Sequence, residues 1–162
     1  MTREEFKELF DQYFDAVRNY IYYRSGDAEL ATDLAQETFL RVWEKQIGYD
    51  QKNVKALLFK ISGNMFVSHF RRQQNMMRIK LDIQPQISGH SPEEHLMFIE
   101  LTEKYEHALS SLPEKQRIVF LMSRMEQLKY HEIADRLGLS LKAVEKRMTL
   151  ALAFLKEKLE VK

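Results

Sequence analysis

The sequence predicts an all-α protein made of two small helical domains joined by a flexible linker. Only five Gly and three Pro occur in 162 residues, and apolar residues recur at steps of three and four, the spacing of one helix face. No long stretch alternates with the period of a strand. Two of the three prolines lie within residues 82–92, a composition typical of a linker. We therefore expect domains over 1–81 and 93–162.

The first domain is predicted to contain three helices. The first helix begins at a capping box, in which the side chains of Thr2 and Glu5 accept hydrogen bonds from free backbone amides. The second helix runs to about residue 47, and the third covers about 53–80. Gly63 lies inside the third helix and indicates a bend there.

The second domain is predicted to begin at another strong helix start. Ser91 is a cap residue, Pro92 suits the first turn, and Glu94 completes a capping box. Pro113 opens the next helix, which reaches about residue 125.

Residues 130–147 have the layout of a helix-turn-helix. Ala134 is small where two helices cross closely, and Gly138 suits a turn that needs a positive φ. Val144 is expected in the small core, and Ser140 caps a second helix whose start would meet base edges in a major groove. An ordinary helical hairpin with a basic rim is the alternative. The candidate DNA-contacting residues here are Ser140, Lys142, Ala143, Glu145, Lys146 and Arg147.

The net charge of +1 conceals a strong alternation along the chain. Residues 1–50 carry six basic and eleven acidic side chains, and residues 51–82 carry seven and one. Residues 83–112 carry one and five, and residues 113–162 carry eleven and seven. Basic blocks alternating with acidic ones favour a nucleic-acid partner for the basic blocks, although solvated helix faces would produce the same pattern.

Three motifs, in this order, make the sequence resemble the extracytoplasmic-function group of sigma-70 factors. The first is DLAQETFLRVW at 33–43, which is similar to the polymerase-binding part of sigma region 2. The second is LFKISGN at 58–64 followed by FRR at 70–72, which is similar to the later part of region 2. The third is LPEKQRIVFL at 112–121 with YHEIA and the helix-turn-helix, which is similar to region 4.

The resemblance implies a protein that binds core RNA polymerase, directs it to promoters and helps to open the duplex. Region 2 over 1–81 would bind polymerase and the minus-ten element, and region 4 over 93–162 would bind the minus-thirty-five element. Trp43 is expected to pack in the core rather than to contact polymerase. The candidate polymerase-binding residues are Asp33, Gln36, Glu37 and Arg41.

The basic block of region 2 is expected to hold promoter DNA near the start site. Lysines and arginines neutralise phosphates, and aromatic faces stack on unpaired bases. Tyr49 and Phe59 are candidate stacking groups, whereas Phe59 and Phe66 have helical spacing that also suits core positions. The candidate DNA-binding residues of region 2 are Lys52, Asn53, Lys55, Lys60, Asn64, Arg71 and Arg72.

Other classes of protein fit less of the sequence. A helix-turn-helix regulator acting without polymerase explains residues 113–162 but gives no role to the motif at 33–43. An enzyme is disfavoured because the five His show no metal-binding spacing and no phosphate loop or nucleophile elbow occurs. We expect no catalytic residue, metal, cofactor, small-molecule substrate or membrane insertion, and the absence of Cys fits the cytoplasm. The resemblance also implies an anti-sigma partner.

Overall fold

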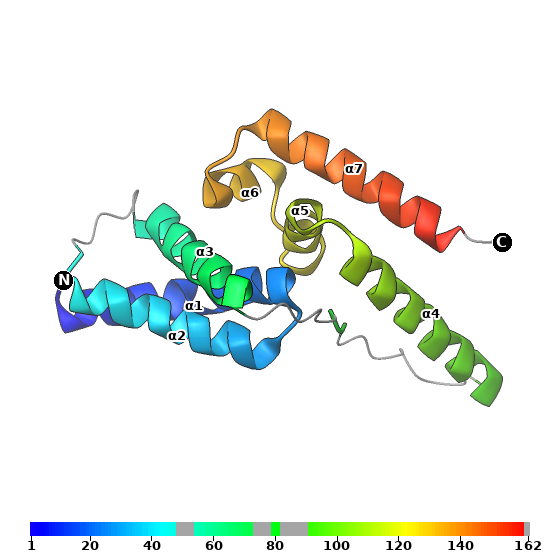
Figure 1. Cartoon of the computed structure of the whole chain (residues 1–162), viewed down its shortest axis with the longest axis horizontal. Coiled ribbons are helices and arrows are strands. Elements are labelled where there is room, and N and C mark those ends of the chain that lie inside the picture. Colours follow the sequence, from blue (N-terminus) through cyan, green and yellow to red (C-terminus); the bar gives the residue numbers. More distant parts are fainter. Residues whose placement is uncertain (48–53, 73–78, 82–90, 161–162) are drawn as a thin grey trace.

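The computed structural model describes residues 1–47, 54–72, 79–81 and 91–160. These ranges form seven α-helices and contain no strand, which confirms the predicted all-α class (Figure 1). The helices are α1 (Arg3–Ser25), α2 (Ala28–Glu44), α3 (Val54–Arg72), α4 (Pro92–Ser111), α5 (Glu114–Met125), α6 (Tyr130–Leu137) and α7 (Leu141–Leu159).

The helix starts follow the predicted capping residues. Thr2 with Glu5 and Ser91 with Glu94 both form complete capping boxes, so each helix has two of its free amides satisfied. The end of α1 is set by Gly26, whose φ of 69° lies in the left-handed region that glycine adopts at little cost.

The first helical group consists of α1, α2 and α3. The aromatic rings of Phe6 and Phe10 on α1 meet Phe39 of α2 at 6.4 and 5.1 Å between centroids. Trp43 is half-buried and packs on Phe6 at 5.1 Å, which agrees with its expected packing role. Offset and edge-on ring pairs of this kind add to the stabilisation from burial alone.

The third helix departs from its prediction in two ways. It continues through Gly63 without interruption. The glycine leaves space for α1, because a Cβ at this position would lie 3.1 Å from the Tyr20 hydroxyl and 3.2 Å from Arg24 Nη1. The helix also stops at Arg72, and residues 79–81 are not helical. The backbone amides of Ile79 and Leu81 instead donate to side chains of α4.

The second group consists of α4 to α7, with α5 at its centre. The side chains of Val119 and Met122 on α5 are fully buried, as are Ile133 of α6 and Val144 of α7. The N-terminal half of α4 extends away from the other helices (Figure 1).

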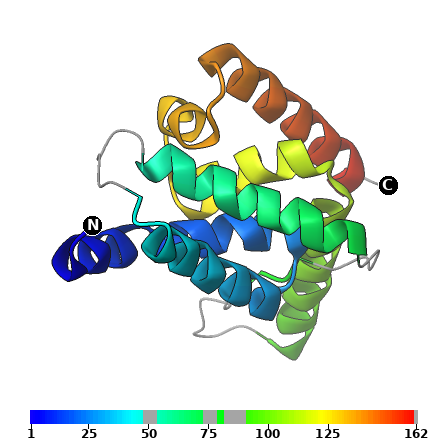
Figure 2. The same ribbon diagram turned by 60° about the vertical axis from the view of Figure 1, so that its left-hand side comes forward.

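The two groups pack directly against one another. The end of α1 lies on α5, and the start of α3 lies beside α6 (Figure 2). The first group therefore meets the second through α1 and through α3, which carries part of the basic block of residues 51–82. The predicted linker, residues 82–92, falls outside the described residues except for Ser91 and Pro92, which begin α4.

Candidate nucleic-acid interface

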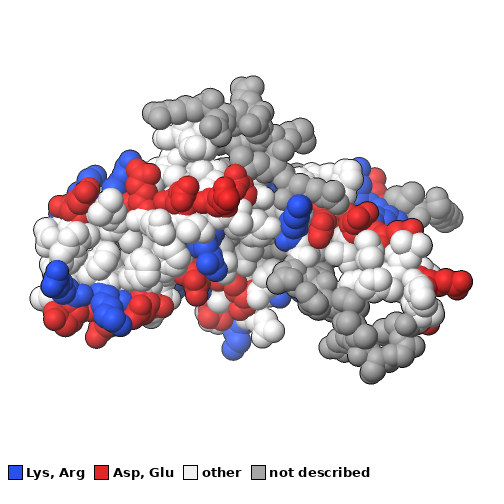
Figure 3. Space-filling view, turned by 90° about the horizontal axis from the view of Figure 1, so that it is seen from below, with Lys and Arg blue, Asp and Glu red and all other residues white. Residues whose placement is uncertain are grey.

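The exposed face of α2 holds all four candidate polymerase-binding residues. Asp33, Gln36, Glu37 and Arg41 are exposed and recur at helical steps, so they share one side of the helix. Arg41 Nη2 lies 3.0 Å from Glu37 Oε1 in a solvent-exposed ion pair. Such a pair contributes little to stability, so these charges remain available to a partner. Figure 3 shows the side of the molecule seen from below, where charged side chains border uncharged surface.

The structure adds Leu40 to this face. Its side chain is 53% exposed and follows Gln36 and Glu37 by one helical turn. A large apolar side chain surrounded by charged ones is the composition of an interface centre with a polar rim. The exposure of Leu40 could have been predicted from the sequence, because helical spacing places it on the polar face of α2 rather than among the buried apolar residues.

The helix-turn-helix has the geometry expected from its sequence. Gly138 ends α6 with a φ of 64°, and its N–H donates to the Ala134 carbonyl. The Ser140 hydroxyl accepts from the Ala143 amide at 3.1 Å and so caps α7. Ala134 and Val144 are both buried where the two helices meet. The start of α7 is consequently held in one orientation by its cap, its turn and its small core.

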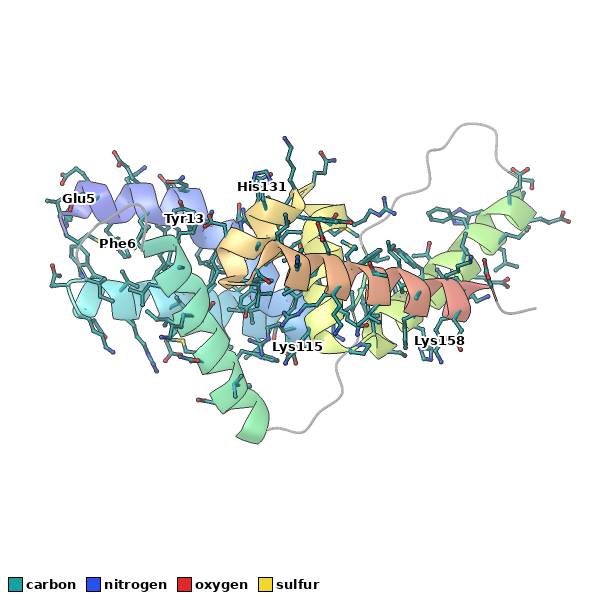
Figure 4. All side chains as sticks on the ribbon, turned by 90° about the horizontal axis from the view of Figure 1, so that it is seen from above. Glu5, Phe6, Tyr13, Lys115, His131 and Lys158 are labelled. Carbon is teal, nitrogen blue, oxygen red and sulfur yellow. The ribbon has the colours of Figure 1, made fainter. Side chains whose placement is uncertain are left out.

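The candidate contacts on α7 are mostly open to solvent. Lys142, Glu145 and Lys146 are exposed, whereas Ala143 and Arg147 are half-buried. Seen from above, α7 runs across the top of the molecule, on the side away from α1 and α2 (Figures 1 and 4). The first turns of α7 thus present two lysines to a ligand without any rearrangement of the chain.

Arg147 has a different environment from its neighbours. It lines a hollow between the two helical groups together with Glu114 and Leu139 of the second group and Tyr20 and Arg24 of the first. Arg147 therefore borders the junction between the groups, whereas the sequence pattern had grouped it with the exposed cations of α7.

The described candidate DNA residues on α3 differ in their surroundings, and Lys60 and Asn64 are exposed. Lys60 and Asn64 line a second hollow between the groups, opposite Arg136 and Gly138. The Lys55 ammonium lies 2.8 Å from the Asp135 carboxylate of α6. Lys52 and Asn53 fall outside the described residues, as do the side chains of Arg71 and Arg72.

The ion pair between Lys55 and Asp135 has a clear electrostatic signature. The hydrogen bond from Lys55, followed by its charge, holds the pKa of the Asp135 carboxyl below its ordinary value. Lys55 retains only 24% of its side-chain exposure, whereas Asp135 retains 72%. The lysine is thus the more enclosed partner, and its charge is already matched by a carboxylate.

The candidate stacking residues of region 2 are core residues where the structure describes them. Phe59 and Phe66 are nearly fully buried, and Phe59 meets the Tyr20 ring edge-on at 5.4 Å. Of the two readings for Phe59 and Phe66, core packing is therefore correct. Tyr49 lies outside the described residues.

Neither a metal nor a membrane span is indicated by the described part of the chain. Its His, Asp and Glu side chains form no group of three or more that could hold a metal ion. No helix within those ranges is both long and apolar enough to cross a bilayer.

Family models match both helical groups. The model described as sigma-70 region 2 matches residues 9–76, and the model described as sigma-70, region 4 matches residues 102–155. The first match covers most of α1 to α3, and the second covers the helix-turn-helix with α5 and most of α4.

Individual relatives span nearly the whole chain. RNA polymerase sigma factor YlaC of Bacillus subtilis is 26% identical, over 88% of this chain and 84% of its own length. Ferric citrate uptake sigma factor FecI of Escherichia coli is 29% identical, over 90% of this chain and 86% of its own.

A solved structure shares the fold. The sigma factor RpoE of Bartonella quintana, crystallised with the anti-sigma factor NepR, matches with a TM-score of 0.65, 24% identity and 98% coverage of both chains. The motif order, the helix-turn-helix geometry, the two family models and these relatives agree: the chain belongs to the sigma-70 family, as a sigma factor of the extracytoplasmic-function group.

Proposed function

We propose that this sigma factor directs core RNA polymerase to promoters, and that each of its two helical groups contacts a different promoter element. Region 2, residues 1–81, binds polymerase and the minus-ten element, and region 4, residues 93–162, binds the minus-thirty-five element. The chain acts in the cytoplasm, contributes no catalytic group and takes no cofactor. The observation that carries the proposal is the pairing, in one chain, of an exposed recognition helix on α7 with an exposed charged face on α2.

The α2 face is the polymerase-binding surface in this proposal. Leu40 supplies apolar area at its centre, and Asp33, Gln36, Glu37 and Arg41 surround it with charge and hydrogen-bonding groups. Interface energy concentrates in central apolar or aromatic anchors, while charges at the rim set orientation and association rate. We therefore assign the binding affinity for polymerase mainly to Leu40, and the orientation of the bound polymerase mainly to the four polar residues.

The start of α7 is the duplex-reading surface. Lys142 and Lys146 neutralise phosphates, and Glu145 can accept from a cytosine amino group in the major groove. Ser140 and Ala143 occupy the first turn, where the positive end of the helix dipole also favours phosphate.

The exposed side of α3 that carries Lys60 and Asn64, with Lys55 near the start of the helix, is the proposed surface for DNA near the start site. Lysines hold the backbone, and Asn64 offers an amide that can hydrogen-bond an exposed base edge. Lys52, Asn53, Arg71 and Arg72 extend the same basic segment along the chain.

An anti-sigma protein is the further partner that we propose. The RpoE chain that shares this fold was crystallised with such a factor. The free half of α4 exposes Leu96, Met97 and Leu101 among acidic residues, a surface suited to a partner with an apolar and basic face.

Reconstituted transcription tests the proposal. The chain is added to sigma-free core polymerase, and the starts of the transcripts are mapped by sequencing. Promoter-specific initiation is the expected result. Initiation at random positions by correctly folded protein overturns the proposal, whereas tight promoter binding by the chain alone, without core, supports an independent helix-turn-helix regulator.

Two variants locate the polymerase surface. Leu40→Ala should weaken core binding about 10-fold or more, as expected when an interface anchor is truncated, while thermal stability stays unchanged because the side chain is exposed. Leu152→Ala is the matched control, since Leu152 is a similarly exposed leucine on α7. Equal loss of core binding in both variants contradicts the assignment.

A further inference from the structure

The hollow that Arg147 borders has a volume of about 500 Å³. It is lined by the end of α1, the first turns of α5, the end of α6 and the turn that follows it, and the second turn of α7. Sites for small molecules have volumes in this range and often lie where two domains meet. Of the candidate DNA and polymerase contacts, only Arg147 lines this hollow, so most of its lining has no role assigned above.

Three cations from three different helices line the hollow. Arg24 belongs to α1, Lys115 to α5 and Arg147 to α7. Glu114 is the one carboxylate in the described lining, and it is paired with Arg24. The lining therefore has a formal charge of +2. Neither Lys115 nor Arg147 has an ion-pair partner among the described residues, so both remain available to an anion.

A second cationic hollow adjoins the first. The two share Tyr20 and Arg24, and the second has a volume of about 370 Å³. Lys60 and Arg136 also line the second hollow, whose described lining holds no carboxylate. Arg136 is paired with Glu126, which lies outside the lining. Positive charge gathered in a recess raises the local concentration of anions, so the two hollows together attract an anionic ligand.

The start of α5 adds to this attraction. Pro113 precedes the helix and provides no side-chain cap, and its carbonyl accepts from the amides of Gln116 and Arg117. A helix start without a side-chain cap leaves backbone amides available, and the helix dipole is positive there. Residues 113–116 all line the hollow. An anion in the hollow would consequently lie beside this positive end.

The walls of the hollow also offer apolar contact. Ile118 is buried, and Leu137 and Leu139 are half-buried. The Tyr20 ring lies where the two hollows meet and is only 9% exposed. An apolar group placed against these side chains would leave water, while a phosphate on the same molecule met the cations.

Arg117 of α5 holds the walls in place. It is buried, its Nε donates to the Tyr23 carbonyl at 2.6 Å, and its Nη2 donates to the Arg24 carbonyl at 2.7 Å. Its Nη1 donates to the carbonyls of Leu112 and Ser110, at 3.1 and 3.3 Å. These bonds join the end of α1 to α5, so the cations of the two helices are positioned before a ligand arrives. Such preorganisation lowers the cost of binding.

We propose that this hollow binds a phosphorylated small molecule of the nucleotide class, as a ligand and not as a substrate. Lys115 and Arg147 hold its phosphate oxygens, because ammonium and guanidinium groups are the usual donors to phosphate. The flat base packs on Leu137, Leu139 and Tyr20. Enclosure by both helical groups favours a small molecule over the backbone of a duplex. The site is a property of the free chain and does not depend on the proposed promoter function.

Titration calorimetry on the full chain tests the site. The probes are ADP and inorganic pyrophosphate, in buffer without divalent cations. One ADP should bind per chain, about tenfold more tightly than pyrophosphate, because only ADP buries apolar surface against the leucines. Absence of ADP binding at millimolar concentration overturns the proposal. Equal affinity for the two probes overturns the assigned class of ligand.

Three charge-removing variants locate the phosphate contacts. Lys115→Gln and Arg147→Gln should each weaken ADP binding about tenfold, because each removes a charge-assisted hydrogen bond. Lys156→Gln is the matched control, since Lys156 is an exposed lysine of α7 that does not line the hollow. Lys115 is exposed, so its variant should fold even if Arg147→Gln does not, and circular dichroism checks both. Equal ADP affinity in Lys115→Gln and Lys156→Gln overturns the proposal.

Methyl NMR locates the ligand without reference to charge. ADP should shift the methyl signals of Ile118, Leu137 and Leu139, and pyrophosphate should shift them less. Leu96 and Leu101, on the exposed half of α4, are the control signals. Shifts that exclude all three lining residues overturn the placement. A nonspecific DNA duplex that displaces ADP and shifts the same signals assigns the hollow to nucleic acid and overturns the small-molecule proposal.

Discussion

The start of α7 and the start of α3 differ in one contact that their sequences do not reveal. Both are lysine-bearing helix surfaces in basic blocks. Lys142 and Lys146 of α7 are free in solvent, whereas Lys55 of α3 is bound to Asp135 of the other domain. Packing between the regions therefore engages Lys55, whereas Lys60 on the same helix is exposed like the two lysines of α7.

In the proposed function both helices contact DNA, and they differ in how much of each is already engaged within the chain. Lys55 is paired with Asp135, whereas Lys60, Lys142 and Lys146 are exposed. Since phosphate contacts dominate nonspecific affinity, this pairing lowers the contribution of Lys55 to DNA binding by the free chain. Substitutions at the engaged and exposed positions separate the two cases, from the largest expected effect to the smallest.

Removing the buried cation should have the largest effect on the junction. Arg117→Ala is expected to lower the free energy of unfolding by about 3 kcal/mol, because it leaves buried carbonyls without donors and removes a charged hydrogen-bond partner. Urea denaturation followed by circular dichroism measures this. Lys115→Ala on the exposed side of α5 should stay within about 0.5 kcal/mol of the unmodified chain. An equally small effect at Arg117 would contradict its central role.

The salt dependence of DNA binding should separate the two surfaces. For the free chain on a duplex promoter fragment, Lys142→Ala with Lys146→Ala should reduce the slope of log K against log salt by about 1.8. Lys55→Ala should leave that slope nearly unchanged in the free chain, because Asp135 already pairs with Lys55, and reduce it by about 0.9 with core polymerase present. Fluorescence anisotropy at several salt concentrations provides the slopes. An equal reduction for Lys55→Ala in the free chain and with core polymerase would show that the ion pair does not compete with DNA.

The turn that orients the start of α7 should tolerate little change at Gly138. A Cβ there meets nothing within 4 Å, so Gly138→Ala costs only the strain of a φ of +64°, about 1–2 kcal/mol. The melting temperature should fall by roughly 2–8 °C. Gly138→Asn should lose less, because asparagine adopts the left-handed region more readily than alanine. Equal melting temperatures for all three chains would contradict this account.

The smallest effect concerns the ion pair between Lys55 and Asp135. Lys55→Met should raise the pKa of the Asp135 carboxyl toward its ordinary value, because the hydrogen bond and charge of Lys55 hold it down. Carboxyl chemical shifts measured by NMR over acidic pH give the value. The sign follows from linkage: a lowered pKa in the folded chain stabilises it above about pH 4, and this contribution is lost as pH falls through the lowered pKa. An Asp135 pKa that is the same in both chains would show that Lys55 does not stabilise the carboxylate.

Much of each domain follows from local sequence signals. The capping boxes at Thr2 and Ser91, the left-handed Gly138 and the Ser140 cap all occur as predicted, because each depends on atoms within four residues. The apolar spacing likewise predicts that α7 directs Lys142 and Lys146 outward.

Other features depend on atoms far apart in the chain. Gly63 was expected to bend α3 and instead admits Tyr20 and Arg24, which are brought close by the packing of α1 on α3. Leu40 could have been placed on the polar face of α2 from helical spacing alone, but its exposure follows from the lack of any described element packed over it.

The sequence by itself determined the helices, their ends, the helix-turn-helix and the alternation of charge, since these arise from interactions within a few residues and from one-sided apolar patterns. Only the tertiary structure decided which charges meet. Arg117 binds the end of α1, and Lys55 finds Asp135, at separations of about ninety and eighty residues. No local pattern encodes such partners, because a basic side chain has the same appearance in sequence whether a phosphate, a carboxylate or water will satisfy it.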